Sequence, residues 1–566
     1  MANFPVSPGA TTSEIDNTFL TGQPVQAGAA IIGPTVKGPV ELPTLVTSYA
    51  DYVNRFGDVL ISGSDTYSYF TSISAYNYFN NGGTSLIVAR VISGSYTAAT
   101  SSVISNYLNV ASSSFTLQTL SEGIIMNSTS PEVSGSLTSG SKDNLRWQIT
   151  NSNTASGTFN VVIRQGNDKN VAPTVLESWN NVSLDPNSSR FISRVIGDQV
   201  LKYNPTSTQI EASTGSFPNQ SRYIRVINVT PLPNYLDNNG NPVSEYTSSI
   251  PINGTGSFGG ATGTIKAGAN FYENINGTNT QGLVAGNYDN MANLLSNRDD
   301  YQFNILSTPG LYDTDYSSTI STIINNTQLR GDNLYVVDLV DYSSGITDAI
   351  AQAQTRDTSY AATYWPWIRI ADPGTGKQVF VPASTLLPGV YAYSDKVSAP
   401  WFAPAGINRG GLSTVLRAKV KLSQANRDDL YSNNINPIAT FPRTGVSVFG
   451  QKTLQKGASA LDRVNVRRLL IELKAYISQI ADTLVFEQNT ITTRNNFLSR
   501  VTPYLQTIQQ KQGLYAFKVL MDDSNNTPDI IDRNQLVGQI YIQPARTAEF
   551  IAIDFILQPT GAQFPG

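Results

Sequence analysis

QFNILSTPGLYDTDYSSTISTIINNTQLRGDNLYVVDLV (residues 302–340) is the stretch that decides the fold of this chain. Its apolar start, residues 302–310, predicts a strand that ends in a Pro-Gly turn. Residues 318–330 have helical spacing of apolar side chains, and residues 333–340 form the short apolar run typical of a buried strand. The same order recurs with a helix over 345–356 and a strand over 365–370. Strands that alternate with helices imply a parallel or mixed sheet.

The rest of the chain is organised around this α/β pattern. A length of 566 residues corresponds to roughly four domains of about 150 residues. Residues 1–20 are interpreted as an extended arm, and residues 21–95 should pair with residues 300–444 as one discontinuous α/β domain. Between them, residues 96–299 are dense in Ser, Thr, Asn and Gly with short alternating runs, which predicts an inserted β-rich outer region of one or two subdomains. Residues 445–566 predict an α+β module. The predicted fold class is therefore a multidomain α/β protein with an inserted all-β part.

The composition excludes several kinds of chemistry. The chain has no cysteine and no histidine, so it can form neither a disulfide nor a thiolate metal site, nor a Ser-His-Asp triad. A net charge of −4 gives no reason to expect direct binding of nucleic acid. No run of 18 apolar residues predicts a membrane span, and the first residues lack the pattern of a secretory signal. We therefore expect a protein that is made and folded in a cytoplasm, without stable membrane insertion.

Two motifs leave a binding function open. The stretch DDSNNTPD (residues 522–529) places oxygen ligands at alternate positions, so Asp522, Ser524 and Asn526 are weak candidates for a calcium loop. It lacks the turn glycine and closing Glu of an EF-hand, and the same residues dominate ordinary turns. Trp365 and Trp367 could form an aromatic platform for a carbohydrate, although packing in the core of an α/β sheet is the simpler interpretation. No catalytic constellation and no cofactor motif with its required context is found.

The two ends of the chain suggest assembly with other chains. An isolated strand is predicted near the N-terminus, separated from the fold by a loop, and a period-2 apolar strand is predicted over 550–557. An isolated strand is suited to completing the sheet of another chain, and an uncovered apolar edge would promote aggregation. The residues expected to take part in this strand exchange are Thr11, Thr12, Ser13, Glu14, Ile15, Ile551, Ile553, Phe555 and Leu557.

Basic residues are scattered along the last two helical stretches. They are Arg467, Arg468, Lys474, Arg494, Arg500 and Lys511. Such residues form either a solvated face or a surface that is complementary in charge to another protein. The sequence leaves both interpretations open.

The order of segments resembles the tail sheath protein of contractile bacteriophages and related contractile injection machines. The resemblance covers roughly residues 1–95 and 300–566. The stretches that carry it include SPGATTSEID (7–16), IIGPTVKGPVELPTLVTSYADYVNRFG (31–57), TYWPWIRIADPGTGKQVFVPAS (363–384), NINPIATFPRTGVSVFGQKTL (434–454) and GQIYIQPARTAEFIAIDF (538–555).

This resemblance implies a structural role without a cofactor or catalysis. Subunits of the family form hexameric rings stacked helically around a tail tube, starting at baseplate proteins and ending at a tail terminator. Contraction of the sheath drives the tube through the host envelope, and the sheath is part of the virion. The resemblance also implies that terminal extensions add strands to the C-terminal module of neighbouring subunits. Helices of that module face the tube, which makes Arg494, Arg500 and Lys511 the candidate tube-facing residues.

Two other classes of protein remain as alternatives. The β-rich insertion and the paired tryptophans would fit a phage surface adhesion or host-recognition protein with a glycan-binding β domain. An α/β enzyme such as a hydrolase is the third possibility, against which the absence of His and Cys and of a nucleophile elbow argues. Electron microscopy of the purified protein separates these classes, because only a sheath subunit should form tubes or stacked rings.

Overall fold

The computed structural model describes residues 25–550, apart from residues 27, 106–111, 129–131, 266, 268–270, 274, 276–280, 282, 284–285 and 443. Both segments predicted to take part in strand exchange, residues 11–15 and 551–557, lie outside the described residues and stay predictions.

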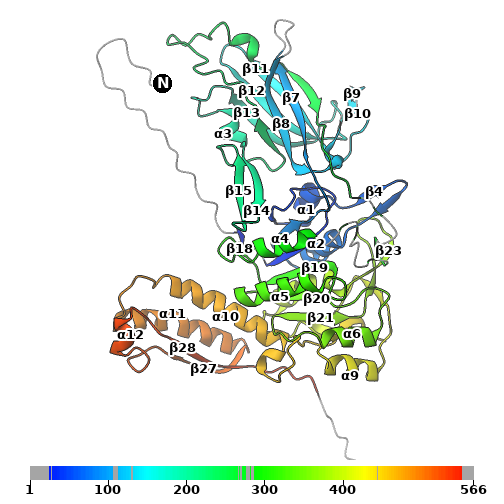
Figure 1. The fold of residues 1–566 in the computed structure, drawn as a ribbon, viewed down its shortest axis with the longest axis vertical. Helices are drawn as coiled ribbons and strands as arrows, with labels where there is room; N and C mark the ends of the chain where they lie inside the picture. Colours follow the sequence, from blue (N-terminus) through cyan, green and yellow to red (C-terminus); the bar gives the residue numbers. More distant parts are fainter. Residues whose placement is uncertain are drawn as a thin grey trace, which may run out of the picture.

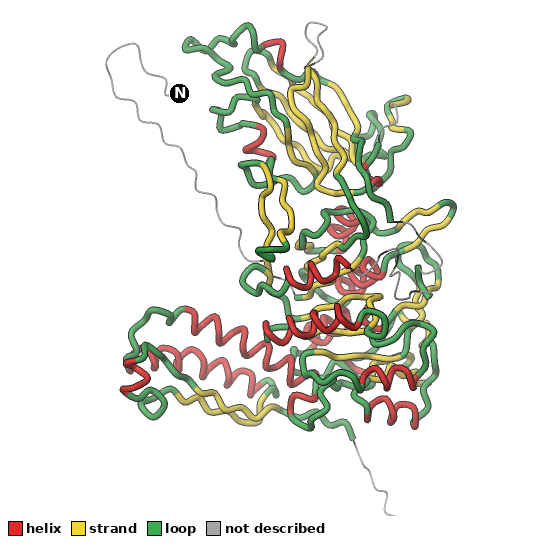
Figure 2. The backbone as a smooth tube through the Cα atoms, in the orientation of Figure 1, coloured by secondary structure: helices red, strands yellow, loops and turns green. Residues whose placement is uncertain are grey.

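Three units follow one another in space. Figure 1 shows a β-rich unit at one end, an α/β core in the middle, and a helical module that projects sideways from the core. Helices are concentrated in the core and the side module, whereas strands dominate the far end (Figure 2). This mixed architecture of many sheets and helices confirms the predicted fold class.

The core is built on one eight-stranded sheet with the order β26-β25-β21-β20-β19-β2-β6-β3. Neighbouring strands from β25 to β6 run parallel, and only the edge pairs β25–β26 and β3–β6 are antiparallel. Strand β2 pairs with β19, so the N-terminal strands join those after residue 301, as the alternating pattern predicted. The strands are β2 (Ala29–Gly33), β3 (Thr44–Val46), β6 (Leu86–Arg90), β19 (Ile305–Tyr312), β20 (Leu334–Asp338), β21 (Ala361–Trp365), β25 (Asn436–Phe441) and β26 (Gly445–Val448).

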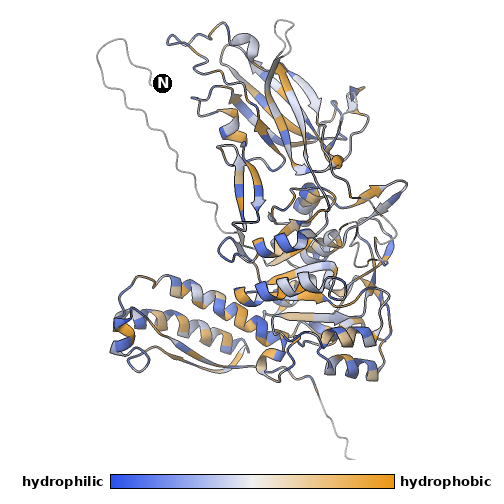
Figure 3. Cartoon of the chain, in the orientation of Figure 1, coloured by the Kyte–Doolittle hydropathy of each residue, from blue (hydrophilic) through white to orange (hydrophobic). Residues whose placement is uncertain are grey.

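Helices cover both faces of this sheet, which is why its strands are apolar throughout. Alternate residues of β20 separate to the two sides: Val336 belongs to one hydrophobic cluster, and Tyr335 to the other. Figure 3 shows the apolar residues gathered on the strands in the middle of the molecule. One face carries α1 (Tyr49–Phe56), α2 (Phe70–Asn80) and α7 (Leu387–Val397), and the other carries α4 (Gly286–Leu294), α5 (Ser317–Arg330), α6 (Ile346–Ala353) and α9 (Gln424–Ser432).

Smaller elements surround the core sheet. A three-stranded antiparallel sheet contains β22 (Ile368–Ala371), β23 (Gln378–Val381) and β24 (Val415–Ala418). Two two-stranded pairs are β1 (Val25–Gln26) with β18 (Tyr301–Gln302) and β4 (Leu60–Ser62) with β5 (Asp65–Tyr67), and α8 (Gly406–Arg409) is a short helix.

Two local predictions are wrong. The single strand expected over 365–370 is divided between two sheets, because β21 ends at Trp365 and β22 begins at Ile368 after a cis Trp365–Pro366 bond. Residues 286–300 are rich in Gly and Asn, a composition that predicts a flexible connection between the insertion and the core. They contain α4 instead, since Tyr288 and Met291 lie one turn apart and are buried against the sheet.

The inserted outer unit is a β-sandwich. A four-stranded sheet (β13-β12-β11-β17) and a three-stranded sheet (β16-β8-β7) contribute to one shared hydrophobic cluster, and the hairpin β14–β15 stands between this unit and the core (Figure 1). The elements are β7 (Ala98–Ser105), β8 (Ser112–Glu122), β9 (Glu132–Val133), β10 (Ser136–Leu137), β11 (Leu145–Asn153), β12 (Thr158–Gln165), β13 (Val175–Ser183), α3 (Ile192–Ile196), β14 (Val200–Asn204), β15 (Gln209–Thr214), β16 (Ile224–Ile227) and β17 (Gly254–Ser257).

The C-terminal module packs two long helices on a hairpin. It contains α10 (Val464–Asp482), α11 (Ile491–Gln510), β27 (Leu514–Leu520), α12 (Pro528–Asp532) and β28 (Gln539–Pro544). A proline inside a helical pattern predicts either two helices or one kinked helix, and α11 is a single helix that continues through Pro503. Because β26 pairs with β25 in the core sheet, the module begins after β26 rather than at residue 445. No helix of the described residues has the length and apolarity that crossing a bilayer would take.

Candidate assembly site in the C-terminal module

The hairpin β27–β28 has two open edges among the residues that the structure describes. The two strands are antiparallel and pair only with each other, from Leu514 opposite Pro544 to Leu520 opposite Gln539. One face packs on the helices through residues such as Phe517 and Ile542. A two-stranded sheet is marginal by itself, and its open edges present unpaired N–H and C=O groups to an added strand. The hairpin is thus the described element best suited to accept a strand from another chain.

The outward face of the hairpin carries both aromatic and charged side chains. Tyr515 and Tyr541 are 63% and 56% exposed, respectively, and the exposed Lys518 lies opposite Tyr541. Rings of this kind supply large contact area at a low cost in side-chain entropy, which is why they are frequent in interfaces. An added strand or a neighbouring subunit would therefore find an amphipathic surface here.

The candidate tube-facing residues do not form one patch. Arg494 is buried, and its guanidinium donates to the carboxylate of Asp523 at 2.6 Å. It lies on the buried side of α11 together with Phe497 and Val501, and its contact with a tube stays a prediction. Arg500 and Lys511 are exposed. They are eleven positions apart, Arg500 within α11 and Lys511 just after its last residue, or roughly 16 Å at 1.5 Å per residue, and their contact with a tube stays a prediction.

Two other arginines tie α10 to the core instead of forming a docking surface. Arg468 is buried and pairs with Asp395 of α7 at 2.5 Å. Arg467 is also buried; its guanidinium lies 3.9 Å from the centre of the Tyr360 ring and hydrogen bonds to Ser359. Both arginines bind groups of the core and are shielded from solvent, so the first turns of α10 and the core form one packed body.

The candidate calcium loop is a hydrogen-bonded turn. Asp522 Oδ1 accepts from the backbone N–H of Ser524 at 2.8 Å. Asn526 is buried, and its carboxamide bonds both the C=O and the N–H of Val537, at 2.8 and 2.9 Å. These oxygens are used within the turn, and the described residues hold no group of three or more acidic, His or Cys side chains suited to a metal ion. The turn chemistry of Asp and Asn explains the motif.

The carbohydrate platform expected as an alternative is not formed. Trp365 and Trp367 are 5% and 4% exposed and lie in the hydrophobic clusters on opposite sides of the core sheet. Core packing, the simpler interpretation, is confirmed. In the outer unit Trp147 is also buried, and its Nε1 donates to Ser101 at 2.8 Å.

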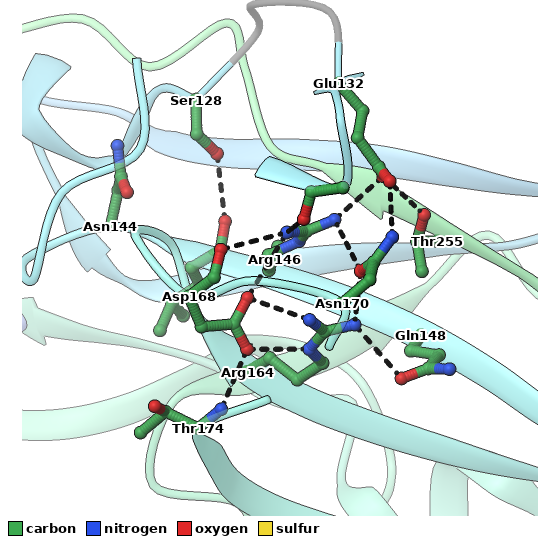
Figure 4. A network of polar contacts seen from close by, with 12 residues as sticks. Ser128, Glu132, Asn144, Arg146, Gln148, Arg164, Asp168, Asn170, Thr174 and Thr255 are labelled. Atoms are coloured by element: carbon green, nitrogen blue, oxygen red, sulfur yellow. Dashed lines mark hydrogen bonds and ion pairs between the residues drawn. The ribbon is translucent and has the colours of Figure 1, made fainter. Parts of the chain in front are cut away.

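The outer unit contains a buried network of charges (Figure 4). Arg146 and Arg164 have fully or nearly fully buried side chains, and both donate to the buried carboxylate of Asp168. Arg146 also pairs with Glu132 at 2.8 Å, and Asn170 accepts from both guanidinium groups. Each acid is thus occupied by an arginine, an arrangement that fixes the β9–β10 hairpin to the sheet rather than one that could perform catalysis.

Buried polar contacts also join the outer unit to the core. Lys37 lies 3.5 Å from the Asp143 carboxylate, and burial lowers the pKa of Lys37 and raises that of Asp143. Arg90 at the end of β6 is buried and donates to the backbone C=O of Gly38 at 2.6 Å and of Glu122 at 2.8 Å. The outer unit is therefore held to the core by contacts that are costly to break.

Sequence reasoning missed two features of this module. Glu549, after β28, binds Tyr431, Gln451 and Arg463 through its carboxylate. Its only sequence signal is a single acid at the start of an apolar run.

Phe486, in the turn between α10 and α11, is fully exposed and has a φ of 71°, which is rare for an aromatic residue. No local pattern announces such a backbone conformation.

Comparisons with known proteins define the class. Residues 273–454 match the family model described as "Phage tail sheath protein central domain", and residues 458–558 match the family model described as "Phage tail sheath C-terminal domain". Together these two matches span half of the chain. This chain belongs to the phage tail sheath family.

Individual relatives agree with this assignment. The tail sheath protein of Vibrio phage KVP40 is 39% identical over 233 residues, which are 40% of this chain and 35% of the relative. The tail sheath protein of Enterobacteria phage T4 is 40% identical over 185 residues, which are 33% of this chain and 28% of the relative. The chain thus spans about a third of the length of these curated relatives. The crystal structure of a sheath tail protein from Listeria innocua covers 92% of this chain and 93% of its own, with a TM-score of 0.54 at 10% identity, which shows a shared fold.

Proposed function

We propose that this chain is the structural subunit of a contractile tail sheath. It polymerises as stacked hexameric rings around an inner tail tube and contracts to drive the tube through the host cell envelope. Its partners are further copies of itself, the tail tube protein, baseplate proteins and a tail terminator, and it is a component of the virion that assembles in the host cytoplasm. Membership of the sheath family supports this role.

The observation that carries the proposal is the hairpin β27–β28, whose two edges are open within residues 25–550 as the structure describes them. The apolar strand predicted over 550–557 begins six residues after β28 ends at Pro544, and a second strand is predicted over 11–15. A neighbour's terminal strands added to both edges would convert the marginal hairpin into a four-stranded sheet. Strand addition of this kind links subunits continuously, so a sheath can change its diameter without losing its connections.

The work of contraction is mechanical in this proposal, and no nucleotide or catalytic residue is required. Contacts between subunits differ between an extended and a contracted lattice. Each additional 100 Å² of apolar surface buried per subunit is worth about 2.5 kcal/mol. Summed over a lattice of many subunits, such a difference supplies a directional stroke.

Deletion of residues 1–18 tests the proposal. The deleted chain should remain folded as a monomer, because the core sheet begins at β2, and it should form no tubes or rings under electron microscopy. Deletion of residues 1–6 serves as the matched control, since it shortens the arm but keeps the strand predicted over 11–15. Normal tubes from the longer deletion would refute strand exchange through the N-terminal arm. Discrete particles from the intact chain under all assembly conditions would refute the sheath function itself.

A further inference from the structure

The chain returns to the core after it leaves β28. The N–H of Ala545 donates to the C=O of Gly513 at 3.0 Å, and Thr547 Oγ1 accepts from the side-chain amide of Asn465 at 3.3 Å. Two residues further on, the carboxylate of Glu549 meets donors from the core. Residues 545–549 therefore run along the junction between the helical module and the core, and they carry the chain away from the hairpin edge.

Four hydrogen bonds hold the Glu549 carboxylate. Arg463 donates two of them in a bidentate pair, from Nε at 2.8 Å and from its second terminal nitrogen at 3.1 Å. The Tyr431 hydroxyl donates at 2.7 Å, and the Gln451 carboxamide at 3.0 Å. Burial alone would raise the pKa of Glu549, but these hydrogen bonds and the Arg463 charge hold it below its ordinary value. We call this group of four residues the Glu549 clamp.

The partners in the clamp come from α9 and from the segment between β26 and α10, and none of them comes from the hairpin. Tyr431 lies in α9, which covers the core sheet, and Gln451 is a buried residue shortly after β26. Arg463 is the residue that precedes the first turn of α10, the helix that Arg467 and Arg468 bind to the core. No member of the clamp other than Glu549 comes from the hairpin side. A pull on the chain beyond Phe550 is thus delivered to the core and not to β28.

We propose that Glu549 is the anchor of the C-terminal arm, by which we mean the residues beyond Phe550, and that it fixes residues 545–549 to the subunit and passes force on the arm into the α/β core. This inference rests on the proposed strand exchange between subunits. Without the anchor, tension on the arm would act first on the single hydrogen bonds of Thr547 and Ala545 and then on β28, one strand of a two-stranded hairpin. Charge-assisted and bidentate hydrogen bonds are the strong ones, so they suit a contact that must hold while the lattice rearranges.

The first measurement uses the monomer and does not depend on polymerisation. Trypsin can cut after Arg546 and release residues 547–566, provided that residues 545–549 first detach from the contacts described above. Glu549→Gln keeps the shape of the side chain but removes its charge, and we expect the release to become about tenfold to a hundredfold faster. Tyr431→Phe removes one donor, and we expect about a threefold to tenfold increase. Mass spectrometry of the released peptide gives the rates.

Two controls separate the clamp from general loosening. Cleavage after Arg298, whose side chain is 61% exposed in a core loop, should keep its rate in every variant. Glu245→Gln removes a carboxylate from an exposed position of the outer unit and should leave the release of residues 547–566 unchanged. An unchanged rate in Glu549→Gln, or an equal acceleration in Glu245→Gln, would overturn the anchor.

The second measurement is assembly. Glu549→Gln should form fewer and shorter tubes than the intact chain at equal protein concentration, with Tyr431→Phe between them and Glu245→Gln unaffected. Faster peptide release together with normal tubes would overturn the role of the anchor in assembly. If the intact chain forms no tubes, the proposed function fails, and the anchoring of residues 545–549 is still decided by the release rates.

Discussion

Replacement of Asp168 by Asn should destabilise the outer β-sandwich strongly. The Asp168 carboxylate accepts two hydrogen bonds from Arg164, at 2.7 and 2.9 Å, one from Arg146 at 3.2 Å and one from the Thr174 N–H at 2.9 Å. An asparagine would turn an NH₂ group toward these donors and leave two buried guanidinium charges without their shared anion. Removing one partner of a buried ion pair costs about 3–5 kcal/mol. We expect a loss of that size in the free energy of unfolding of the outer unit.

Glu132→Gln is the matched control in the same network. Glu132 also pairs with Arg146, at 2.8 Å, but its side chain is 32% exposed, whereas that of Asp168 is fully buried. Water compensates an exposed carboxylate, and exposed pairs contribute about 0–1 kcal/mol. The two substitutions therefore make the same chemical change next to the same arginine and differ mainly in burial.

Native-state hydrogen exchange is the suitable assay, because a chain with several units need not unfold in one step. Peptides from β11 and β12 should lose about two to four orders of magnitude of protection in Asp168→Asn, and less than about tenfold in Glu132→Gln. Peptides from β20 in the core sheet should keep their protection in both. A loss below about 1 kcal/mol for Asp168→Asn, or equal losses for the two variants, would refute the argument that burial makes the network stabilising.

Two further predictions concern the core and the helical module. Burial raises the pKa of Asp338 to about 6 despite hydrogen bonds from Ser384. The folded state therefore binds the proton more tightly than the unfolded chain does, and stability is lost as the pH rises from about 4 through about 6. The expected loss is about 3 kcal/mol, at 1.4 kcal/mol per pKa unit. Asp338→Asn should lack this loss in urea titrations at about pH 4 and about pH 7, and an identical pH dependence in both proteins would contradict it. Phe486→Asn should raise the free energy of unfolding by about 1 kcal/mol, because asparagine tolerates the positive φ of 71° and the exposed ring has no packing to lose. Phe486→Ala lacks the side-chain amide whose local hydrogen bonds favour asparagine at positive φ, and it should gain nothing. An equal gain for alanine in thermal or urea unfolding would point to the ring instead.

Local periodicity was sufficient to predict most of the elements around the core sheet. The apolar run ending at Val340 is a strand, the stretch with isoleucines at 320, 323 and 324 is a helix, and they alternate as the sequence indicated. These predictions succeed because each element must bury one face or both. Its apolar residues therefore recur every two residues in a strand and every three to four residues in a helix. Where a short-range signal was ambiguous, as at α4 with its glycine and asparagines, the tertiary contacts decided.

The candidate site was only partly predictable for the same reason. The hairpin strands carry a period-2 pattern, so their presence could be expected from the sequence. The role of each charged residue could not be predicted from that pattern. Arg494 and Arg500 look alike in the sequence, yet Arg494 is paired inside the module and Arg500 is exposed. The orientation of α11 about its own axis against α10 decides which of its side chains are buried.

The sequence by itself therefore determined the class of fold, the positions of most helices and strands, and the absence of cysteine and histidine chemistry, since all of these depend on composition or on neighbours along the chain. The tertiary structure alone decided which polar groups are partners. Glu549 and Arg463 are 86 residues apart, and Lys37 and Asp143 are 106 apart. Pairs at such separations are created by the packing of whole units, and no local pattern records them.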